Sequence, residues 1–415
     1  MRTPIAELIS RVLSGAVAVE AYDGSTAGPV EAKVRLVLRS PRALSYLLTA
    51  PSELGLARAF VSGELEIHGD LYDALTAVWS TNIGHLSWGE RLRVLRNVDP
   101  RALRWVDPPA EEYGARRLRT GLRHSKDRDA AAISHHYDVS NTFYEWVLGP
   151  SMTYTCACYP TEDSTLEEAQ AHKYDLVCRK LGLEPGMRLL DVGCGWGGMV
   201  RHAAEHYGVQ ALGVTLSRRQ AEWAKERIAS DGLGHLAEVR FSDYRDVPEA
   251  EFDAISSIGL TEHIGKDNLP SYFRFLADKA RPHARLLNHC ITRPTTTEPN
   301  HFGGFIDRYV FPDGELEGVG LIISAMQDNG FEVRHEENLR EHYARTLAGW
   351  CANLSAHWDD AVDEVGGGRA RVWALYMAGS RLGFERHTIE LHQVLGVKLD
   401  KDASAGLPLR PDWGV

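Results

Sequence analysis

The stretch RLLDVGCGWGGMVRHAAEHYGVQALGVTL, residues 188–216, decides the fold of this chain. Its first five residues form a short apolar run that breaks into glycine-rich residues 193–198 and resumes with helical spacing through Met199, Ala203 and Ala204. A second apolar run, residues 209–216, comes at the distance that a parallel crossover needs. The stretch therefore predicts a strand, a tight turn, a helix and a second, parallel strand.

The turn between this strand and helix has the composition of a loop that binds a flat, polar ligand. Its glycines let the backbone approach a ligand closely, and the start of the helix presents unpaired N–H groups beside it. Dinucleotide sites use a related loop, so the loop alone does not identify the cofactor. A glycine-rich turn that binds no ligand is the alternative that these residues leave open.

The spacing of the glycines in the loop and the residues at the end of the second strand distinguish between cofactors. A dinucleotide-binding loop is expected to read G-x-G-x-x-G, with an acidic residue after the second strand. Here the glycines of the loop have the spacing G-x-G-x-G, and the second strand ends without a carboxylate. The residues concerned are Gly193, Gly195 and Gly197 of the loop and Thr215, Leu216 and Ser217 of the strand end.

Two acidic residues near the predicted loop instead suit S-adenosylmethionine (SAM). Asp191 stands two residues before the first glycine of the loop, and Asp243 comes after the third predicted strand. The ammonium and hydroxyl groups of SAM need hydrogen-bond acceptors, which carboxylates supply. We therefore interpret the loop as part of a SAM site.

Length and composition exclude several classes of protein. The 415 residues are enough for two domains, and no apolar run is long enough to predict a transmembrane helix or a signal peptide. The net charge of −11 disfavours nucleic acid as a partner, because phosphate contacts need a basic surface. The six cysteines lack the paired spacing of a zinc site, so we expect no metal and a reducing, cytoplasmic location.

Composition also divides the chain into three parts. Residues 1–110 predict a small α+β domain, with strands at 31–38 and 63–69 and a helix and turn between them. Residues 111–133 form a basic linker that either meets lipid headgroups or is a solvated connection. Residues 134–415 predict an α/β catalytic domain, a doubly wound, Rossmann-like sheet with a helical cap.

The elements predicted in this domain are deduced from the periodicity of the apolar residues. They are helices at 166–181 and 218–230, strands at 238–241, 252–258 and 286–291, a lid at 292–316, a helix and strand within 319–333, and a helical C-terminal half. Glu262 and His263 come after the fourth strand, at the edge where such sheets hold ligands. We expect His263 to point away from Glu262, because neighbours on an extended stretch alternate sides.

Residues 134 to about 395 resemble the cyclopropane-fatty-acyl-phospholipid synthase family of SAM-dependent methyltransferases. The wording is most similar to that of the actinobacterial enzymes that begin methyl-branched, tuberculostearic-type fatty acids, and the N-terminal segment is similar to a lipid-associated domain that some members carry. The blocks that carry the resemblance are HHYDVSNTFYEWVL, SMTYTCACY, LLDVGCGWGG, GVTLSRRQ, DYRDV, IGLTEHIG, NHCITRP, DRYVFPDGEL and HYARTL.

The resemblance implies two sets of site residues. The first binds SAM: Tyr154, Thr155, Gly193, Gly195, Thr215, Leu216 and Gln220, with Asp243 and Tyr244 around the adenine. The second holds a small anion, bicarbonate or carbonate, beside the transferred methyl group: Cys156, Glu262, His289, Tyr343 and the backbone of Ile291.

The reaction that the resemblance implies explains the need for an anion. A cis alkene in an acyl chain is a poor nucleophile and has no proton that could be removed before it reacts. Methyl transfer therefore leaves a carbocation, which needs nearby negative charge and a base. Proton loss then gives a cyclopropane or an alkene, and the resemblance favours a 10-methylene product. The partners implied are phospholipid acyl chains at the inner face of the membrane, a separate NADPH-dependent reductase, and further copies of this chain in a homo-oligomer.

Two other classes of function remain for comparison. The first is a SAM methyltransferase acting on RNA, DNA or a small nucleophile. Its types that methylate amino groups of nucleic acids would carry an N/D-P-P-Y/W-like run after strand four, where this chain has Gly259-Leu260-Thr261-Glu262. A lipid-binding subunit without activity would keep the fold, but the intact glycine loop and anion residues disfavour that interpretation.

Overall fold

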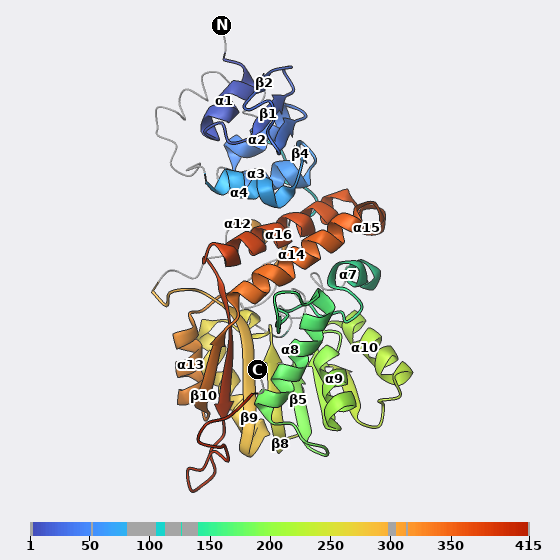
Figure 1. Ribbon diagram of the computed structural model, residues 1–415, viewed down its shortest axis with the longest axis vertical. Coiled ribbons are helices and arrows are strands. Elements are labelled where there is room, and N and C mark those ends of the chain that lie inside the picture. The colour runs from blue at the N-terminus through green and yellow to red at the C-terminus, as the bar shows by residue number, and fades with distance from the viewer. Residues whose placement is uncertain are drawn as a thin grey trace. The chain divides into compact units, whose positions relative to one another are not determined.

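The computed structural model describes residues 3–50, 53–80, 105–112, 126, 140–297, 304–312 and 314–413. The chain forms two compact units (Figure 1). The first unit contains residues 1–118, 302–312 and 357–382, and the second unit contains the rest. The first unit thus includes two segments from the later part of the chain that were expected in the catalytic domain. Residues 135–139 of the motif HHYDVS and most of the basic linker lie outside the described residues.

The second unit is built on one sheet of seven strands in the order β10-β11-β9-β8-β5-β6-β7. The five strands from β9 to β7 run parallel, whereas β11 is antiparallel to β9 and to β10. The strands are β5 (Arg188–Val192), β6 (Gln210–Thr215), β7 (Ala237–Phe241), β8 (Phe252–Ile258), β9 (Ala280–Thr292), β10 (Glu332–Asn338) and β11 (Glu390–Val397).

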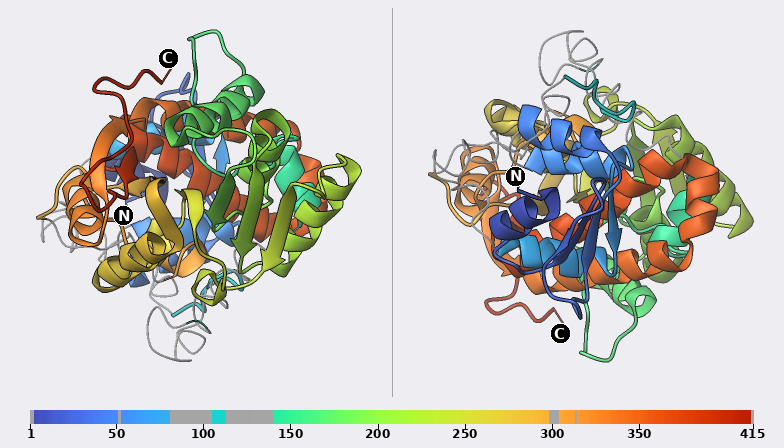
Figure 2. Two further views of the ribbon diagram at one scale, coloured as in Figure 1. Left: turned by 90° about the horizontal axis from the view of Figure 1, so that it is seen from below. Right: turned by 90° about the horizontal axis from the view of Figure 1, so that it is seen from above.

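Helices cover both faces of this sheet (Figure 2). Leu189 and Leu190, neighbours on β5, lie in two different apolar clusters, because successive side chains of a strand point to opposite faces. Helices α8, α9 and α10 contribute to the first cluster, and α11 and α13 to the second. Their bounds are α8 (Leu166–Leu181), α9 (Gly198–Tyr207), α10 (Arg218–Ser230), α11 (Leu269–Lys279) and α13 (Val319–Asp328).

Further helices and three short turns complete the described part of the second unit. They are α7 (Asn141–Leu148), α14 (Arg340–Ala356) and the 3-10 turns η4 (Tyr244–Asp246), η5 (Thr261–His263) and η6 (Lys266–Asn268). Local sequence explains where the helices begin and end. Thr165 and Glu168 form a reciprocal capping box at the start of α8, and Gly182 ends that helix in the left-handed conformation.

The α/β fold class and most element positions are confirmed. The predicted bounds of α8, α10 and β8 match the structure residue for residue. The expectation of a helical C-terminal half is wrong at β11, which inserts between β9 and β10 and makes the sheet mixed. All but the first residue of β11 are buried, so the strand has no polar alternation that would reveal it.

The first unit has its own four-stranded sheet, in the order β2-β1-β3-β4. Its strands β3 and β4 lie within the two stretches predicted as strands, whereas the shorter β1 and β2 were not predicted. The strands are β1 (Ala18–Ala21), β2 (Thr26–Ala27), β3 (Arg35–Leu38) and β4 (Leu65–His68). The helices are α1 (Ile5–Val12), α2 (Pro41–Thr49), α3 (Glu53–Val61), α4 (Leu71–Trp79), α12 (Gly304–Tyr309), α15 (Trp358–Val365) and most of α16 (Gly367–Glu385).

A buried ion pair joins distant segments of the first unit. Arg58 on α3 donates two hydrogen bonds of 2.6 Å to the carboxylate of Glu112, and both side chains are at most 5% exposed. Arg308 and Tyr309 on α12 donate to the same carboxylate at 2.9 and 3.0 Å. Because Glu112 accepts from four donor groups, its buried charge is compensated.

No helix in the described part of the chain combines the length and the apolar character needed to cross a membrane.

Candidate functional site

The glycine loop adopts the backbone conformation that its sequence predicts. Gly193, Gly195 and Gly197 have φ angles of +75°, +54° and +74°, a region that side chains with a Cβ rarely adopt. The backbone N–H groups of Gly193 and Cys194 both donate to the carbonyl of Val214, which holds the loop against β6. Two backbone hydrogen bonds therefore hold the loop against the neighbouring strand.

The three glycines differ in what surrounds them. A Cβ on Gly197 would contact Ala224 at 3.1 Å, and one on Gly193 would contact Leu260 at 3.3 Å. A Cβ on Gly195 would meet nothing closer than the amide nitrogen of Gln220, at 4.0 Å. Gly195 thus faces open space beside Gln220, another residue of the predicted SAM set.

Asp191 lies on β5, one residue before its end and next to this loop, and is 2% exposed. Ser256 on the neighbouring strand β8 donates to its carboxylate at 2.7 Å. Burial raises the pKa of Asp191 to about 6, although the Ser256 hydrogen bond and the nearby Lys173 act in the opposite direction. A cationic ligand beside Asp191 would favour the ionised carboxylate, as expected for the ammonium of SAM.

The end of the second parallel strand carries a polar pair in place of an acid. The hydroxyl of Thr215 donates to the side-chain oxygen of Gln220 at 2.7 Å, and both residues are buried. Ser217 caps α10 by accepting from the backbone N–H of Gln220. Leu216 lies between these residues, so three members of the predicted SAM set come together at the start of α10.

Asp243 and Tyr244 come after β7, at the same edge of the sheet. Burial alone would raise the pKa of Asp243, but Arg245 donates to its carboxylate through the backbone N–H and the guanidinium and lowers that pKa. The Tyr244 ring packs edge-on against Tyr272 and Phe275, at centroid distances of 5.3 and 5.5 Å. The Asp243 carboxylate is therefore a charged hydrogen-bond acceptor next to a cluster of aromatic rings.

Tyr154, Thr155 and Cys156 form a segment that packs on α14. The Tyr154 ring lies 5.5 Å from that of Trp350 on this helix, centroid to centroid. The Cys156 thiol donates to the carbonyl oxygens of Ala157 and Leu339, at 3.1 and 3.8 Å, and burial raises its pKa well above the usual value. Cys156 is therefore a neutral thiol, a weak hydrogen-bond donor rather than a nucleophile.

Glu262 lies on η5, shortly beyond β8, and is 9% exposed. One carboxylate oxygen, Oε1, accepts from the backbone N–H of Ile291 at 2.7 Å. The other, Oε2, is buried and has no hydrogen-bond partner among the described residues. Burial raises the pKa of Glu262 to about 7, although the Ile291 hydrogen bond lowers it in part.

His289 lies on β9 in direct register with Ile258, the last residue of β8, and is 1% exposed. Its Nδ1 lies 3.2 Å from the side-chain nitrogen of Gln393, whereas its Nε2 is buried and has no partner in the described part of the chain. Burial, with the positive charges of Lys173 and Lys180, holds the pKa of His289 well below its usual value. The ring is therefore neutral.

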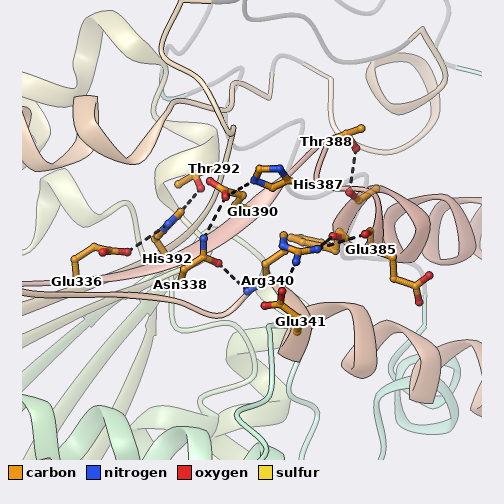
Figure 3. Close-up of polar contacts among 12 residues, drawn as sticks. Thr292, Glu336, Asn338, Arg340, Glu341, Glu385, His387, Thr388, Glu390 and His392 are labelled. Atoms are coloured by element: carbon orange, nitrogen blue, oxygen red, sulfur yellow. Dashed lines mark hydrogen bonds and ion pairs between the residues drawn. The ribbon is translucent and has the colours of Figure 1, made fainter.

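Tyr343 lies one turn into α14 and is 6% exposed. Its ring contacts those of Trp350 and Phe384, at centroid distances of 6.0 and 4.6 Å. Figure 3 shows how the start of this helix is held: Arg340 donates to the carbonyls of Phe384 and Glu385, and its backbone N–H donates to the side chain of Asn338. This network fixes the turn of α14 that carries Tyr343.

A bound anion fits the groups that the described residues leave unpaired. A buried polar atom without a partner costs free energy, and both Glu262 Oε2 and His289 Nε2 are in this condition at the carboxyl ends of neighbouring strands. An ion such as bicarbonate carries both a donor hydroxyl and acceptor oxygens, the two kinds of group that these atoms lack. The predicted Ile291 N–H donor is bonded to Glu262 here, so an anion would have to share it.

Two sequence-based expectations about this edge need revision. Thr261–His263 is a 3-10 turn, not an extended stretch, so the alternation that was expected to turn His263 away does not apply. Of the predicted lid, residues 304–312 belong to the first unit, and residues 298–303 and 313 lie outside the described residues. Its last part contacts the site, since the backbone N–H of Glu315 donates to the Glu262 carbonyl at 2.9 Å.

Three buried polar residues near the site were not predicted from the sequence. Lys173 on α8 donates to the hydroxyl of Thr155 at 3.1 Å, and burial lowers its pKa to about 8. Lys180, on the same helix, donates to Gln393 on β11. The signal that could have revealed the lysines is their spacing of seven, which places both on the apolar face that includes Val177.

The strand order and the loop, with carboxylates at the carboxyl edge of the sheet, define the class as a SAM-dependent methyltransferase. The chain matches the family model described as mycolic acid cyclopropane synthetase over residues 124–394. The chain therefore belongs to this family of SAM-dependent C-methyltransferases.

Individual relatives and solved structures agree with this assignment. The chain is 56% identical over 400 residues to a probable fatty acid methyltransferase of Mycobacterium tuberculosis, covering 95% of this chain and 93% of the relative. It is 38% identical over 383 residues to a probable fatty acid methyltransferase of Pseudomonas putida, covering 91% and 90%. The crystal structure of mycolic acid cyclopropane synthase CmaA1 complexed with SAH and CTAB is similar, with a TM-score of 0.62, 33% identity, and coverage of 65% of this chain and 98% of that one.

Proposed function

We propose that this enzyme methylates the cis double bond of an unsaturated, oleoyl-like acyl chain in a membrane phospholipid and forms a 10-methylene product. Two relatives that match over at least 90% of this chain carry the name fatty acid methyltransferase, which supports an acyl substrate. The single observation that carries the proposal is the pair of buried, unpartnered atoms, Glu262 Oε2 and His289 Nε2, at the same edge of the sheet as the SAM loop.

SAM supplies the methyl group, and bound bicarbonate supplies a negative charge and a base beside the reacting carbons. The chain's own residues would hold SAM through Asp191, the glycine loop and the Thr215–Gln220 pair. Neutral His289 would donate to the anion from Nε2, and Cys156 and Tyr343 would add weaker or longer contacts. With a pKa of about 7, Glu262 can share a proton with the anion, so that two bare negative charges do not face each other.

The chemistry of the lipid determines what the site must do. Attack of the alkene electron pair on the methyl group would form one C–C bond and break the sulfur–methyl bond of SAM, which leaves as S-adenosylhomocysteine, with a cation on the adjacent chain carbon. A hydride shift would move the positive charge to the methyl-bearing carbon, and loss of a proton from the new methyl group would then leave a C=CH₂ (methylene) group on the chain. Buried side chains around the site exclude water that would otherwise trap the cation.

Ring closure on the same substrate is the second candidate, because the family model and a similar solved structure are both described as cyclopropane synthases. The two outcomes share the first cation and differ in its fate, since direct proton loss from the methyl group closes the ring. A separate NADPH-dependent reductase would saturate a 10-methylene chain to the 10-methyl chain, whereas a cyclopropane needs no such partner. We propose that the enzyme works at the inner face of the membrane and as a homo-oligomer.

Isotope transfer tests the proposed function. The protein is incubated with SAM carrying a ¹³C-labelled methyl group, sodium bicarbonate and vesicles of dioleoyl phosphatidylglycerol, and the hydrolysed fatty acids are analysed by mass spectrometry. We expect an oleoyl chain that is heavier by one labelled CH₂ unit, in proportion to the S-adenosylhomocysteine released. S-adenosylhomocysteine release without acyl labelling, or label in the headgroup alone, would contradict the proposal.

A further inference from the structure

We propose that Gln393, oriented by Lys180, is a positioning residue that holds His289 in the tautomer with its proton on Nε2, so that this nitrogen faces the anion as a donor. The role of that proton, as a hydrogen-bond donor to the anion, rests on the proposed function. The tautomer itself is a consequence of contacts within the second unit alone.

The pairing of two strands brings Gln393 to His289. The residues are direct partners in the antiparallel ladder between β9 and β11, so their side chains lie on the same face of the sheet. Gln393 is fully buried, and its side-chain nitrogen Nε2 lies 3.2 Å from His289 Nδ1. Both side chains are shielded from bulk solvent, with exposed fractions of 0% and 1%.

Lys180 decides which way the Gln393 amide points. Its Nζ donates to the amide oxygen Oε1 at 2.7 Å and also pairs with the carboxylate of Glu337. A lysine bonded to a carboxylate is an ammonium with donors only, so the atom of Gln393 that faces it must be the oxygen. The NH₂ group of Gln393 therefore faces His289, and the usual ambiguity of an amide orientation is removed.

The orientation of the amide then decides the tautomer of His289. An amide NH₂ can only donate, so Nδ1 must accept with its lone pair. In a neutral imidazole the single proton then resides on Nε2, the atom that has no partner among the described residues. The same contact disfavours imidazolium, whose Nδ1–H would meet the amide hydrogens.

Glu337, Lys180 and Gln393 thus form a chain of donors and acceptors that ends at His289. Lys180 and Gln393 are fully buried, whereas the Glu337 side chain is about one-third exposed, at 32%. A lysine on this buried helix face has a high desolvation cost, which the carboxylate and the amide oxygen offset. A methionine would pack in its place without that cost, but it would leave the amide free to turn over.

The substitution Gln393→Glu tests the proposal because it reverses the hydrogen bond with little change of shape. A carboxylate would accept from Nδ1–H, and the proton would leave Nε2. The tautomer is read directly from long-range ¹H–¹⁵N spectra of ¹⁵N-histidine-labelled protein, since protonated and unprotonated ring nitrogens have well-separated shifts. The His289 signals are assigned by their loss in His289→Gln.

We expect the Nε2–H form in the wild type and the Nδ1–H form in Gln393→Glu. We also expect the variant to need at least about tenfold more bicarbonate for half-maximal activity, with SAM affinity unchanged, because one donor to the anion is lost. The exposed substitution Gln327→Glu on α13 makes the same change of charge and serves as the control. The second variant, Lys180→Met, should give a mixture of tautomers.

An Nδ1–H tautomer in the wild type overturns the proposal without any variant. An unchanged tautomer in both folded variants, Gln393→Glu and Lys180→Met, also overturns it. The spectra require neither lipid nor SAM, so failure of the proposed function would appear separately, as a wild-type enzyme with the Nε2–H tautomer that forms no labelled acyl product.

Discussion

The carboxylate of Glu262 is bonded through one oxygen only: Oε1 accepts from the backbone N–H of Ile291 at 2.7 Å, and Oε2 is buried without a partner among the described residues. This relationship ties the turn after β8 to the end of β9 and leaves half of the carboxylate for another group. It also explains why the carboxyl is easily protonated, since burial outweighs the single backbone hydrogen bond.

The first prediction concerns the role of Glu262 in the reaction. Glu262→Ala removes an interaction made chiefly with the bound anion, so kcat should fall by roughly 100-fold or more, the scale of losing one preorganised electrostatic contact. The dissociation constant of SAM, measured by calorimetry, should change little. A variant that loses SAM binding in proportion to activity, or that keeps full activity in bicarbonate-depleted buffer, would refute this role.

The second prediction is a pH dependence of stability. The pKa of Glu262 is raised in the folded protein, so the protonated carboxyl stabilises the fold below about pH 4.5, and this contribution is lost as the pH rises toward 7. Glu262→Gln removes this dependence. As the pH rises from about 4.5 to about 7, the free energy of unfolding of the variant should therefore increase by on the order of 3 kcal/mol relative to that of the wild type. Urea unfolding at several pH values measures the difference.

The exposed substitution Glu226→Gln on α10 is the matched control, and its stability relative to the wild type should not vary with pH in this way. If Glu262→Gln parallels the wild type across the whole range, the carboxyl is not buried in the manner described.

The third prediction concerns the glycine loop. Gly195→Val places a branched side chain in the open space beside Gln220, and SAM affinity should fall by about 100-fold through steric overlap. Gly232→Val is the matched control, because Gly232 also has a positive φ, +70°, and open surroundings. Both variants carry the same backbone strain of ~1–2 kcal/mol, but only the first should lose SAM. Equal SAM affinities would show that the ligand does not approach Gly195.

The fourth prediction concerns the core of the first unit. Arg58→Met leaves the buried Glu112 with Arg308 and Tyr309 as its side-chain donors among the described residues, so the protein should lose about 3 kcal/mol of stability. Arg11→Met, which breaks an exposed pair with Glu7, should cost less than about 0.5 kcal/mol. Chemical unfolding of the full chain compares them, and similar costs would mean that the Glu112 pair adds little to stability.

The parallel part of the catalytic sheet could be predicted from sequence because its signals are local. The run from Arg188 to Thr215 contains two apolar strands, a glycine turn and an amphipathic helix within about thirty residues. The predicted Glu262 and His289 also lie where the ends of parallel strands meet, so strand order alone brings them to one edge.

The missed parts depend on contacts between distant residues. Lys180 and Gln393 are 213 positions apart, and Gln393 belongs to a strand buried on both faces, which periodicity cannot distinguish from a buried helix segment. The contact between the Gln393 amide and His289 therefore could not be predicted from sequence, because it depends on the pairing of β11 with β9. The conformation of His263 was not predicted for a similar reason, because a three-residue 3-10 turn leaves no periodic signal.

The central claim, methyl transfer to an alkene and then proton loss that leaves a methylene group, is tested most directly by proton NMR of the lipid product. Mass cannot decide, because the methylene and cyclopropane chains are isomers. After incubation with SAM, bicarbonate and dioleoyl phosphatidylglycerol vesicles, the account predicts vinylidene hydrogens in the purified acyl chains. Upfield cyclopropane hydrogens without vinylidene signals would contradict it and assign the enzyme to ring closure.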